Sequence, residues 1–398
     1  MIRTDDIFTG INEGALERLT FLAGSDKEKI LFIDIETTGL SPKNSDLYLI
    51  GCAYLQNDRW HIEQFFAETS EEEEEVLKAF SEFCAPFEVF VHFNGDKFDI
   101  PFLKAKYEKY GLDDPFEKKD SFDIYKSVRH YKNRLGLPDV KQKTIELYLG
   151  IDRKDEYSGG KLITVYNEYV KNRDPASKDI ILLHNFEDVK GLMEILPILS
   201  YDEFFNRFKS MPGVSVRTDG DLSIFEAQEE LFGNLPLRAV KVQANYYKDY
   251  DGKEKKEVYM KFILPFELPS SLSGNEEGFY FKIEKNEGIL RAPLYETELK
   301  YFYSNYKDYY YLPHEDMAIH KSLADFVDKN FKEKAKPENC YTKKTGQYLK
   351  EWDLVFAPFF KKDYGDKNFY FDLNDNIKKS RYAMSLYASH VISHILEL

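Results

Sequence analysis

The chain has 398 residues, more than one typical domain, and 43% of them are hydrophobic, which is enough for real cores. Its formal net charge of −15 argues against a protein that coats nucleic acid non-specifically. Three scattered cysteines, Cys52, Cys84 and Cys340, exclude a disulfide framework and a zinc site. The N-terminus lacks the apolar core of a signal peptide and no apolar run approaches the ~18 residues of a membrane span, so we expect a cytoplasmic protein without a membrane partner.

The first half of the chain shows an order of elements typical of the α/β class. After an N-terminal lead over residues 1–27, short polar turns separate strands in an antiparallel meander, predicted at residues 30–33, 46–54 and 60–66. Later strand and helix patterns alternate, with a strand at 88–93, a mixed segment at 120–128, and helices at 71–83, 100–110, 145–149, 162–170 and 177–199. Residues 28–200 are therefore predicted to form a mixed sheet flanked by helices.

The second half of the chain, residues 201–398, is richer in aromatic residues and is predicted to be a β-rich α+β domain. Short alternating strands are expected within a β-rich part over residues 213–312, at 214–216, 239–247, 258–265, 278–284 and 288–292. A helical part is expected over residues 314–398, with helices at 314–336 and 376–396. The sequence does not indicate the role of this domain, which could bind substrate or a protein partner.

Two carboxylates follow the first buried strand of the meander. Asp34 and Glu36 are two residues apart, so their side chains point to the same face of the strand. Burying two acids together is costly unless a cation holds them, and Mg²⁺ or Mn²⁺ prefers carboxylate oxygens. In the Thr37-Thr38-Gly39 turn that follows, Gly39 would let the backbone approach a phosphate closely.

Two further groups of polar residues carry candidate chemistry. The segment 92–99 leaves a strand, turns at Asn94-Gly95 and places Asp99 at the start of a helix, where an isolated Asp would equally be read as an N-cap. In the last helix, His184 and Asp188 are four residues apart and share one face. That spacing suits a general base beside a metal-binding carboxylate, although a surface ion pair would show it too.

Together, these three segments resemble the motifs of the DEDD exonucleases, the DnaQ-like branch of the RNase H-like fold. Residues 34–39 are similar to the first motif of that family, residues 94–99 to the second and residues 184–188 to the third. The resemblance covers roughly residues 28–200. Three residues separate His184 from Asp188, whereas the His subtype of the family has four, so His184 stands where a Tyr usually stands. This combination, with the segment 150–159, is similar to the YprB-like group of predicted exonucleases.

The resemblance implies a 3′→5′ exonuclease that hydrolyses DNA or RNA with two Mg²⁺ or Mn²⁺ ions. Asp34, Glu36, Asp99 and Asp188 would bind the ions, and His184 would orient or deprotonate the attacking water. A single-stranded 3′ end is the expected substrate, and its expected contacts are Thr37, Thr38, Gly39, Asn94, Lys104 and Lys106. The two lysines could equally be ordinary solvated helix charges. A structure-specific endonuclease and an inactive nucleic-acid-binding scaffold on the same fold stay open as alternatives.

Overall fold

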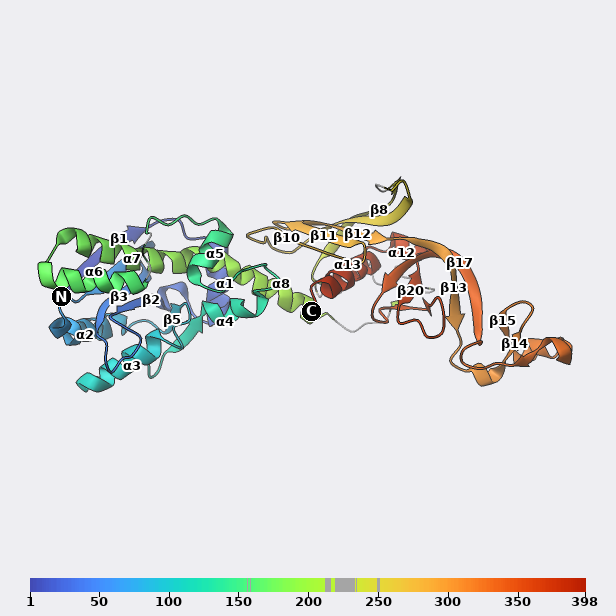
Figure 1. The fold of residues 1–398 in the computed structure, drawn as a ribbon, viewed down its shortest axis with the longest axis horizontal. Helices are drawn as coiled ribbons and strands as arrows, with labels where there is room; N and C mark the ends of the chain where they lie inside the picture. Colours follow the sequence, from blue (N-terminus) through green and yellow to red (C-terminus); the bar gives the residue numbers. More distant parts are fainter. Residues whose placement is uncertain (156, 158, 212–215, 219–232, 234, 249–250) are drawn as a thin grey trace. The chain divides into compact units, whose positions relative to one another are not determined.

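A computed structural model of the protein describes residues 1–155, 157, 159–211, 216–218, 233, 235–248 and 251–398. The chain divides into two compact units, Met1–Glu203 and Phe204–Leu398 (Figure 1). No helix within the described residues is both long enough and apolar enough to cross a membrane.

The first unit is built on a six-stranded mixed sheet with the order β1-β4-β3-β2-β5-β6. The strands are β1 (Ile2–Phe8), β2 (Ile30–Thr37), β3 (Leu47–Gln56), β4 (Arg59–Phe66), β5 (Val89–His92) and β6 (Asp120–Asp123). Strands β1 to β4 pair antiparallel, whereas β5 pairs parallel with both β2 and β6. The predicted meander and the mixed sheet are therefore confirmed.

Helices flank this sheet, as predicted for the α/β class. They are α1 (Glu13–Ala23), α2 (Glu73–Cys84), α3 (Asp99–Tyr110), α4 (Ile124–Val128), α5 (Gln142–Leu149), α6 (Gly159–Asn172) and α7 (Pro175–Glu194). A further helix, α8 (Ser200–Lys209), spans the boundary between the two units. The long helix α7 starts where the side chain of Asp174 accepts hydrogen bonds from the N–H groups of Ala176 and Ser177. Pro175 occupies the first turn, where its missing N–H costs no helical hydrogen bond.

The N-terminal segment belongs to the sheet of this unit. We expected residues 1–27 to be a lead, but β1 pairs with β4 along its whole length, from Ile2 opposite Phe66 to Phe8 opposite Trp60. As an edge strand β1 buries little of its surface, and the acids Asp5 and Asp6 interrupt the apolar alternation that reveals a strand.

Helix α7 lies against β2, β3 and β4, and it approaches β3 most closely at Gly51. Gly51 is the register partner of Asp34. A Cβ atom at Gly51 would lie 2.1 Å from Oδ1 of Asn185 and 2.7 Å from Cγ2 of Val189. The missing side chain at Gly51 therefore sets how near the helix that carries His184 comes to the strand that carries Asp34.

Gly51→Ala is expected to lower the free energy of unfolding by about 1–3 kcal/mol, because the added methyl group must push α7 away from the sheet. Thermal or urea unfolding measures this change. Gly160→Ala is the matched control, since a Cβ atom there meets no atom within 4 Å and alanine suits a helix. Equal stability of the two variants would contradict the close approach at Gly51.

The second unit is rich in strands, as predicted, and its described residues form four sheets. Their strand orders are β10-β11-β12-β9-β8, β13-β17-β20-β19, β15-β14-β16 and β18-β7. The strands are β7 (Val216–Arg217), β8 (Arg238–Lys248), β9 (Glu254–Ile263), β10 (Leu272–Glu276), β11 (Phe279–Glu284), β12 (Glu287–Pro293), β13 (Tyr295–Phe302), β14 (Tyr309–Leu312), β15 (Met317–His320), β16 (Glu333–Lys334), β17 (Tyr341–Glu351), β18 (Phe356–Ala357), β19 (Phe359–Phe360) and β20 (Phe369–Asp372). Of the strand expected at 214–216, residues 214 and 215 lie outside the described residues.

The expected helical part over residues 314–398 is largely wrong. Residues 314–336 contain β15, β16 and only a four-residue helix, α11 (Lys321–Ala324), and β17 to β20 follow. Strand β14, which contains three tyrosines, pairs with β15 and β16 on its two sides, and this pairing outweighs the helical periodicity. The expected helix at 376–396 is present as α12 (Asp375–Lys379) and α13 (Arg381–Ile395), and α13 is buried from Tyr382 to Ile392.

Candidate active site

The end of β2 carries Asp34 and Glu36 next to helix α7. Glu36 is buried, and Asp34 is half-buried. The side chain of Asn185, on α7, donates a hydrogen bond of 3.0 Å to Oδ2 of Asp34. A register shift between Glu36 and Thr37 ends the regular pairing of β2 with β3 just after the two acids.

Asp99 is the first residue of α3 and is buried. The N-cap position is held by Phe98 without a side-chain hydrogen bond, so Asp99 does not serve as the helix cap. The preceding turn is held by Asn94, which adopts a left-handed φ of 61° and donates its N–H to Oδ1 of Asp123 at 2.7 Å. Gly95 donates its N–H to Nδ1 of His92, whose ring would collide with a Cβ atom at Gly95.

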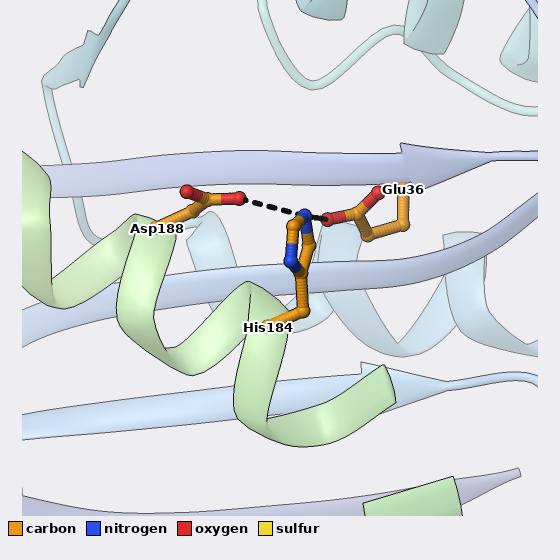
Figure 2. A group of neighbouring side chains, drawn as sticks. All are labelled: Glu36, His184 and Asp188. Atoms are coloured by element: carbon orange, nitrogen blue, oxygen red, sulfur yellow. Dashed lines mark ion pairs between the residues drawn. The ribbon is translucent and has the colours of Figure 1, made fainter. Parts of the chain in front are cut away.

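His184 lies beside both Glu36 and Asp188 (Figure 2). Its Nε2 atom is 3.6 Å from Oε1 of Glu36 and 3.3 Å from Oδ2 of Asp188. The side chain of His184 is only 4% exposed, so the alternative of a surface pair on the helix does not hold. Ligand atoms of these three residues all lie within 4.8 Å of one another, which is close enough to hold one ion.

The four predicted carboxylates are close enough to repel one another. Burial raises the pKa of Asp34 well above its ordinary value, and the charges of Asp188, Glu36 and Asp99 raise it further. The pKa of Glu36 is raised for the same two reasons, first by burial and then by Asp188 and Asp99. Burial also raises the pKa of Asp99 to about 7. The structure thus brings Asp34, Glu36, Asp99 and Asp188 into one electrostatically linked group, in which Glu36 and Asp99 are buried and Asp34 and Asp188 are half-buried.

Sequence reasoning missed two side chains that hold the third motif. Arg153 donates from Nη2 to Oδ1 of Asp188 at 2.7 Å, and its Nη1 lies 3.0 and 3.1 Å from the two carboxylate oxygens of Glu146. Asp155 accepts a hydrogen bond of 2.7 Å through Oδ2 from Nδ1 of His184. Arg153 and Asp155 both lie in the segment 150–159, which the sequence analysis used only for the resemblance to the YprB-like group. Residues 156 and 158 of this segment lie outside the described residues.

A fifth buried carboxylate, Asp123, was also missed. Its charge raises the pKa of Asp99, and it caps α4 by accepting from the N–H of Tyr125. Asp123 also belongs to a second group that could hold an ion, with His92 and Asp96. Asp96 is already paired with Lys126 and accepts from the hydroxyl of Ser121, so the first group is the better candidate within the described residues.

The donor set of the first group fits a divalent cation. Carboxylate oxygens, such as those of Glu36 and Asp188, are the preferred ligands of Mg²⁺ and Mn²⁺. Arg153 pairs with Asp188, but the pKa values of Asp34 and Glu36 stay raised, because burial and the neighbouring carboxylates outweigh the charge of Lys143 at Glu36. A bound divalent ion would supply the missing positive charge.

The polar groups of the loop after β2 form hydrogen bonds within the loop. The hydroxyl of Thr37 donates to the carbonyl of Gly39 at 2.9 Å, and the hydroxyl of Thr38 accepts from the N–H of Asp46 at 2.8 Å. A Cβ atom at Gly39 would lie 2.6 Å from Oγ of Ser45. Thr37, Thr38 and Gly39 therefore shape this loop, and their contact with a substrate stays a prediction.

The prediction that Lys106 contacts the substrate is wrong. Lys106 is buried in α3 and its Nζ lies 2.7 Å from Oε1 of Glu73 and 2.5 Å from the carbonyl of Ser45. An ammonium group held in this way cannot reach a phosphate. Lys104, two residues earlier, points to the exposed side of the helix, where it pairs with Asp114 at 3.3 Å.

Lys106→Met is expected to lower the free energy of unfolding by about 3 kcal/mol, because it leaves the buried carboxylate of Glu73 without its nearest cation. Lys104→Met should change it by less than about 1 kcal/mol, since the pair with Asp114 is exposed. Chemical denaturation of the two variants compares them directly. A stable Lys106→Met protein would show that the buried pair contributes nothing.

Comparisons with known proteins agree with this fold. The family model of the RNase_H superfamily matches residues 31–200. Protein YprB of Bacillus subtilis (strain 168) is 26% identical over 201 residues, covering 48% of this chain and 46% of YprB. A PolC-type DNA polymerase III of Caldanaerobacter subterraneus subsp. tengcongensis is 25% identical over 296 residues, covering 61% of this chain and 20% of the polymerase. The chain thus spans less than half the length of these relatives.

Solved structures show a more remote similarity. The family B DNA polymerase of Pyrobaculum calidifontis aligns with a TM-score of 0.35 and 14% identity, over 70% of this chain and 35% of that one. E. coli exonuclease I in complex with a dT13 oligonucleotide aligns with a TM-score of 0.31 and 10% identity, over 59% and 54%. Both TM-scores are below 0.5. Residues 31–200 thus match the family model of the RNase_H superfamily, and their mixed sheet with flanking helices has an RNase H-like fold. The similarity to YprB agrees with the predicted resemblance.

Proposed function

We propose that the protein is a divalent-metal-dependent 3′→5′ exonuclease that hydrolyses single-stranded DNA or RNA from its 3′ end. One observation carries the proposal: Asp34, Glu36, Asp99 and Asp188 converge from three motifs into one electrostatically linked group beside His184, in which the pKa values of Asp34, Glu36 and Asp99 are raised. Two Mg²⁺ or Mn²⁺ ions held by these four carboxylates would balance their charge. The RNase H-like fold of residues 31–200 supports the proposal.

The proposed reaction is hydrolysis of the terminal phosphodiester. Divalent ions held by Asp34, Glu36, Asp99 and Asp188 would lower the pKa of an attacking water and stabilise negative charge on the phosphate. His184, whose Nε2 faces Glu36 and Asp188, accepts the proton of that water as a new oxygen–phosphorus bond forms. The bond from phosphorus to the 3′ oxygen breaks, and that oxygen takes up a proton. Nucleoside 5′-monophosphates are the expected products.

Exonuclease action can be tested with end-labelled single strands. A strand labelled at its 3′ end should release labelled mononucleotide first in Mn²⁺ or Mg²⁺, a 5′-labelled strand should shorten stepwise, and EDTA should stop both reactions. DNA and RNA of one sequence compare the two substrates. Cleavage of a circular strand would favour the endonuclease alternative instead. Failure to cleave either polymer with either ion would favour the inactive scaffold.

We also propose that the protein acts in the cytoplasm. All three cysteines are buried free thiols, which supports a reducing compartment. 

A further inference from the structure

Asp155 contacts His184 through the ring nitrogen that faces away from the carboxylate group. Its Oδ2 atom is 2.7 Å from Nδ1 of His184, whereas Nε2 of the same ring lies near Glu36 and Asp188. The side chains of Asp155 and His184 are 2% and 4% exposed, so water does not compete for this hydrogen bond. The two nitrogens of the imidazole therefore have separate surroundings.

The chemistry of the contact selects one tautomer of the imidazole. An ionised carboxylate can only accept hydrogen bonds, so Nδ1 of His184 must carry the proton that Asp155 accepts. Burial raises the pKa of Asp155, but the N–H of Tyr157 and the charges of His184 and Lys143 outweigh burial and lower it. In the neutral ring, Nε2 then holds a lone pair beside Glu36 and Asp188.

Asp155 is itself fixed in place. Its Oδ1 accepts the N–H of Tyr157 at 2.9 Å, and Nζ of Lys143 lies 3.2 Å from its Oδ2. Lys143 also donates to the carbonyl of Tyr157 at 2.7 Å, which holds the two partners together. Nη2 of Arg153 lies 3.5 Å from Oδ2 of Asp155 and 2.7 Å from Asp188. Asp155 and Arg153 thus hold His184 and Asp188, respectively, in place.

We propose that Asp155 is a positioning residue that holds His184 as its Nδ1–H tautomer, with Nε2 presented to the water that attacks the phosphodiester. The proposal rests on the proposed nuclease function, which it deepens. It gives a physical account of a His at a position where the resembling family usually has a Tyr. A tyrosine hydroxyl needs no choice of tautomer, but an imidazole with the wrong nitrogen protonated could not accept the proton of the water.

Kinetics of Asp155→Asn test the role in hydrolysis. We expect kcat to fall about 10²- to 10⁴-fold with little change in KM, because an amide can donate to Nδ1 and favour the opposite tautomer. Asp155→Glu should recover part of the activity, since it restores a carboxylate. Asp152→Asn, the same chemical change at an exposed neighbour, is the matched control and should leave kcat unchanged.

A double-mutant cycle separates positioning from a purely structural role. If Asp155 acts through His184, adding Asp155→Asn to His184→Ala should cause no further loss of kcat. A further loss in the double variant, equal to the loss in the wild-type background, would overturn the proposal. Thermal unfolding confirms that each variant is folded.

The tautomer can also be observed without any turnover. In protein with ¹⁵N-labelled histidine at about pH 8.5, two-bond ¹H–¹⁵N spectra should show His184 protonated at Nδ1, and the signal is assigned by its loss in His184→Ala. Asp155→Asn should move the proton to Nε2 or mix the tautomers. Protonation of wild-type His184 at Nε2 would overturn the proposal. An inactive wild type with the predicted tautomer would refute the proposed function but not the positioning by Asp155.

Discussion

Replacing Asp34 with Asn should reduce Mn²⁺-dependent hydrolysis by about 10³-fold or more and raise the melting temperature of the metal-free protein. Activity falls because one charged ligand of the proposed metal site is lost. Stability rises because Asp34 destabilises the folded state in either protonation state. The ionised form is repelled by Glu36 and Asp188, and the neutral form keeps its proton at a pH far above the ordinary pKa of an aspartate. Asparagine has the same shape and can still accept from Asn185.

Opposite signs of the two effects distinguish a binding site from a structural ion pair. Removing an acid that is matched by a cation lowers stability, whereas removing one of several repelling acids raises it. Calorimetry in EDTA and the 3′-label assay in Mn²⁺ measure the two quantities. Asp58→Asn is the matched control, because Asp58 is an exposed turn residue with a φ of 58°, which asparagine tolerates. Retained activity, or a clear loss of stability, in Asp34→Asn would contradict the proposed metal site.

The residues of the candidate site that could be predicted are those placed by local geometry. Two-residue periodicity puts Asp34 and Glu36 on one face of β2, and four-residue spacing puts His184 and Asp188 on one face of α7. Both relations depend only on the type of element, and the apolar patterns of the two segments make that type clear. The fold of residues 30–199 followed from the same patterns.

The residues that could not be predicted depend on contacts between distant segments. Asp155 and His184 are 29 residues apart, and no periodicity links a loop residue to one face of a helix. Lys104 and Lys106 look alike in the sequence, yet only the second faces the buried carboxylate of Glu73 across the fold. Which side of a helix is buried depends on its partners as well as on its own residues.

In the second unit, the secondary structure of residues 314–336 depends on strand pairing and not on local propensity. The segment 314–336 contains residues that favour a helix, but β15 pairs with the preceding strand β14 in a hairpin, and β16, further along the chain, pairs with the other side of β14. The same reason explains β1, whose partner β4 is about sixty residues further along the chain. Pairing partners of this kind cannot be identified from one sequence alone.

The metal-free protein should lose stability as the pH rises from about 4 to about 7, and Mn²⁺ or Mg²⁺ should reverse the loss. Burial raises the pKa of Asp99 from an ordinary 3.8 to about 7, so in this range the folded protein holds a proton that the unfolded chain has released. The unfolded state then binds fewer protons, and the free energy of unfolding falls with pH by about 1.4 kcal/mol per unit and per group. Asp34 and Glu36 act in the same direction.

Divalent ions act in the opposite direction, because they bind the deprotonated carboxylates of the folded state only. The rise in melting temperature caused by Mn²⁺ should therefore grow with pH. Melting temperatures from pH 5 to pH 8, in EDTA and in Mn²⁺, measure both effects, and Asp99→Asn should flatten the curve in EDTA. A metal-free protein that becomes more stable as the pH rises through this range would mean that the carboxylates are already neutralised by Arg153 and Lys143, and the need for a cation at the end of β2 would disappear.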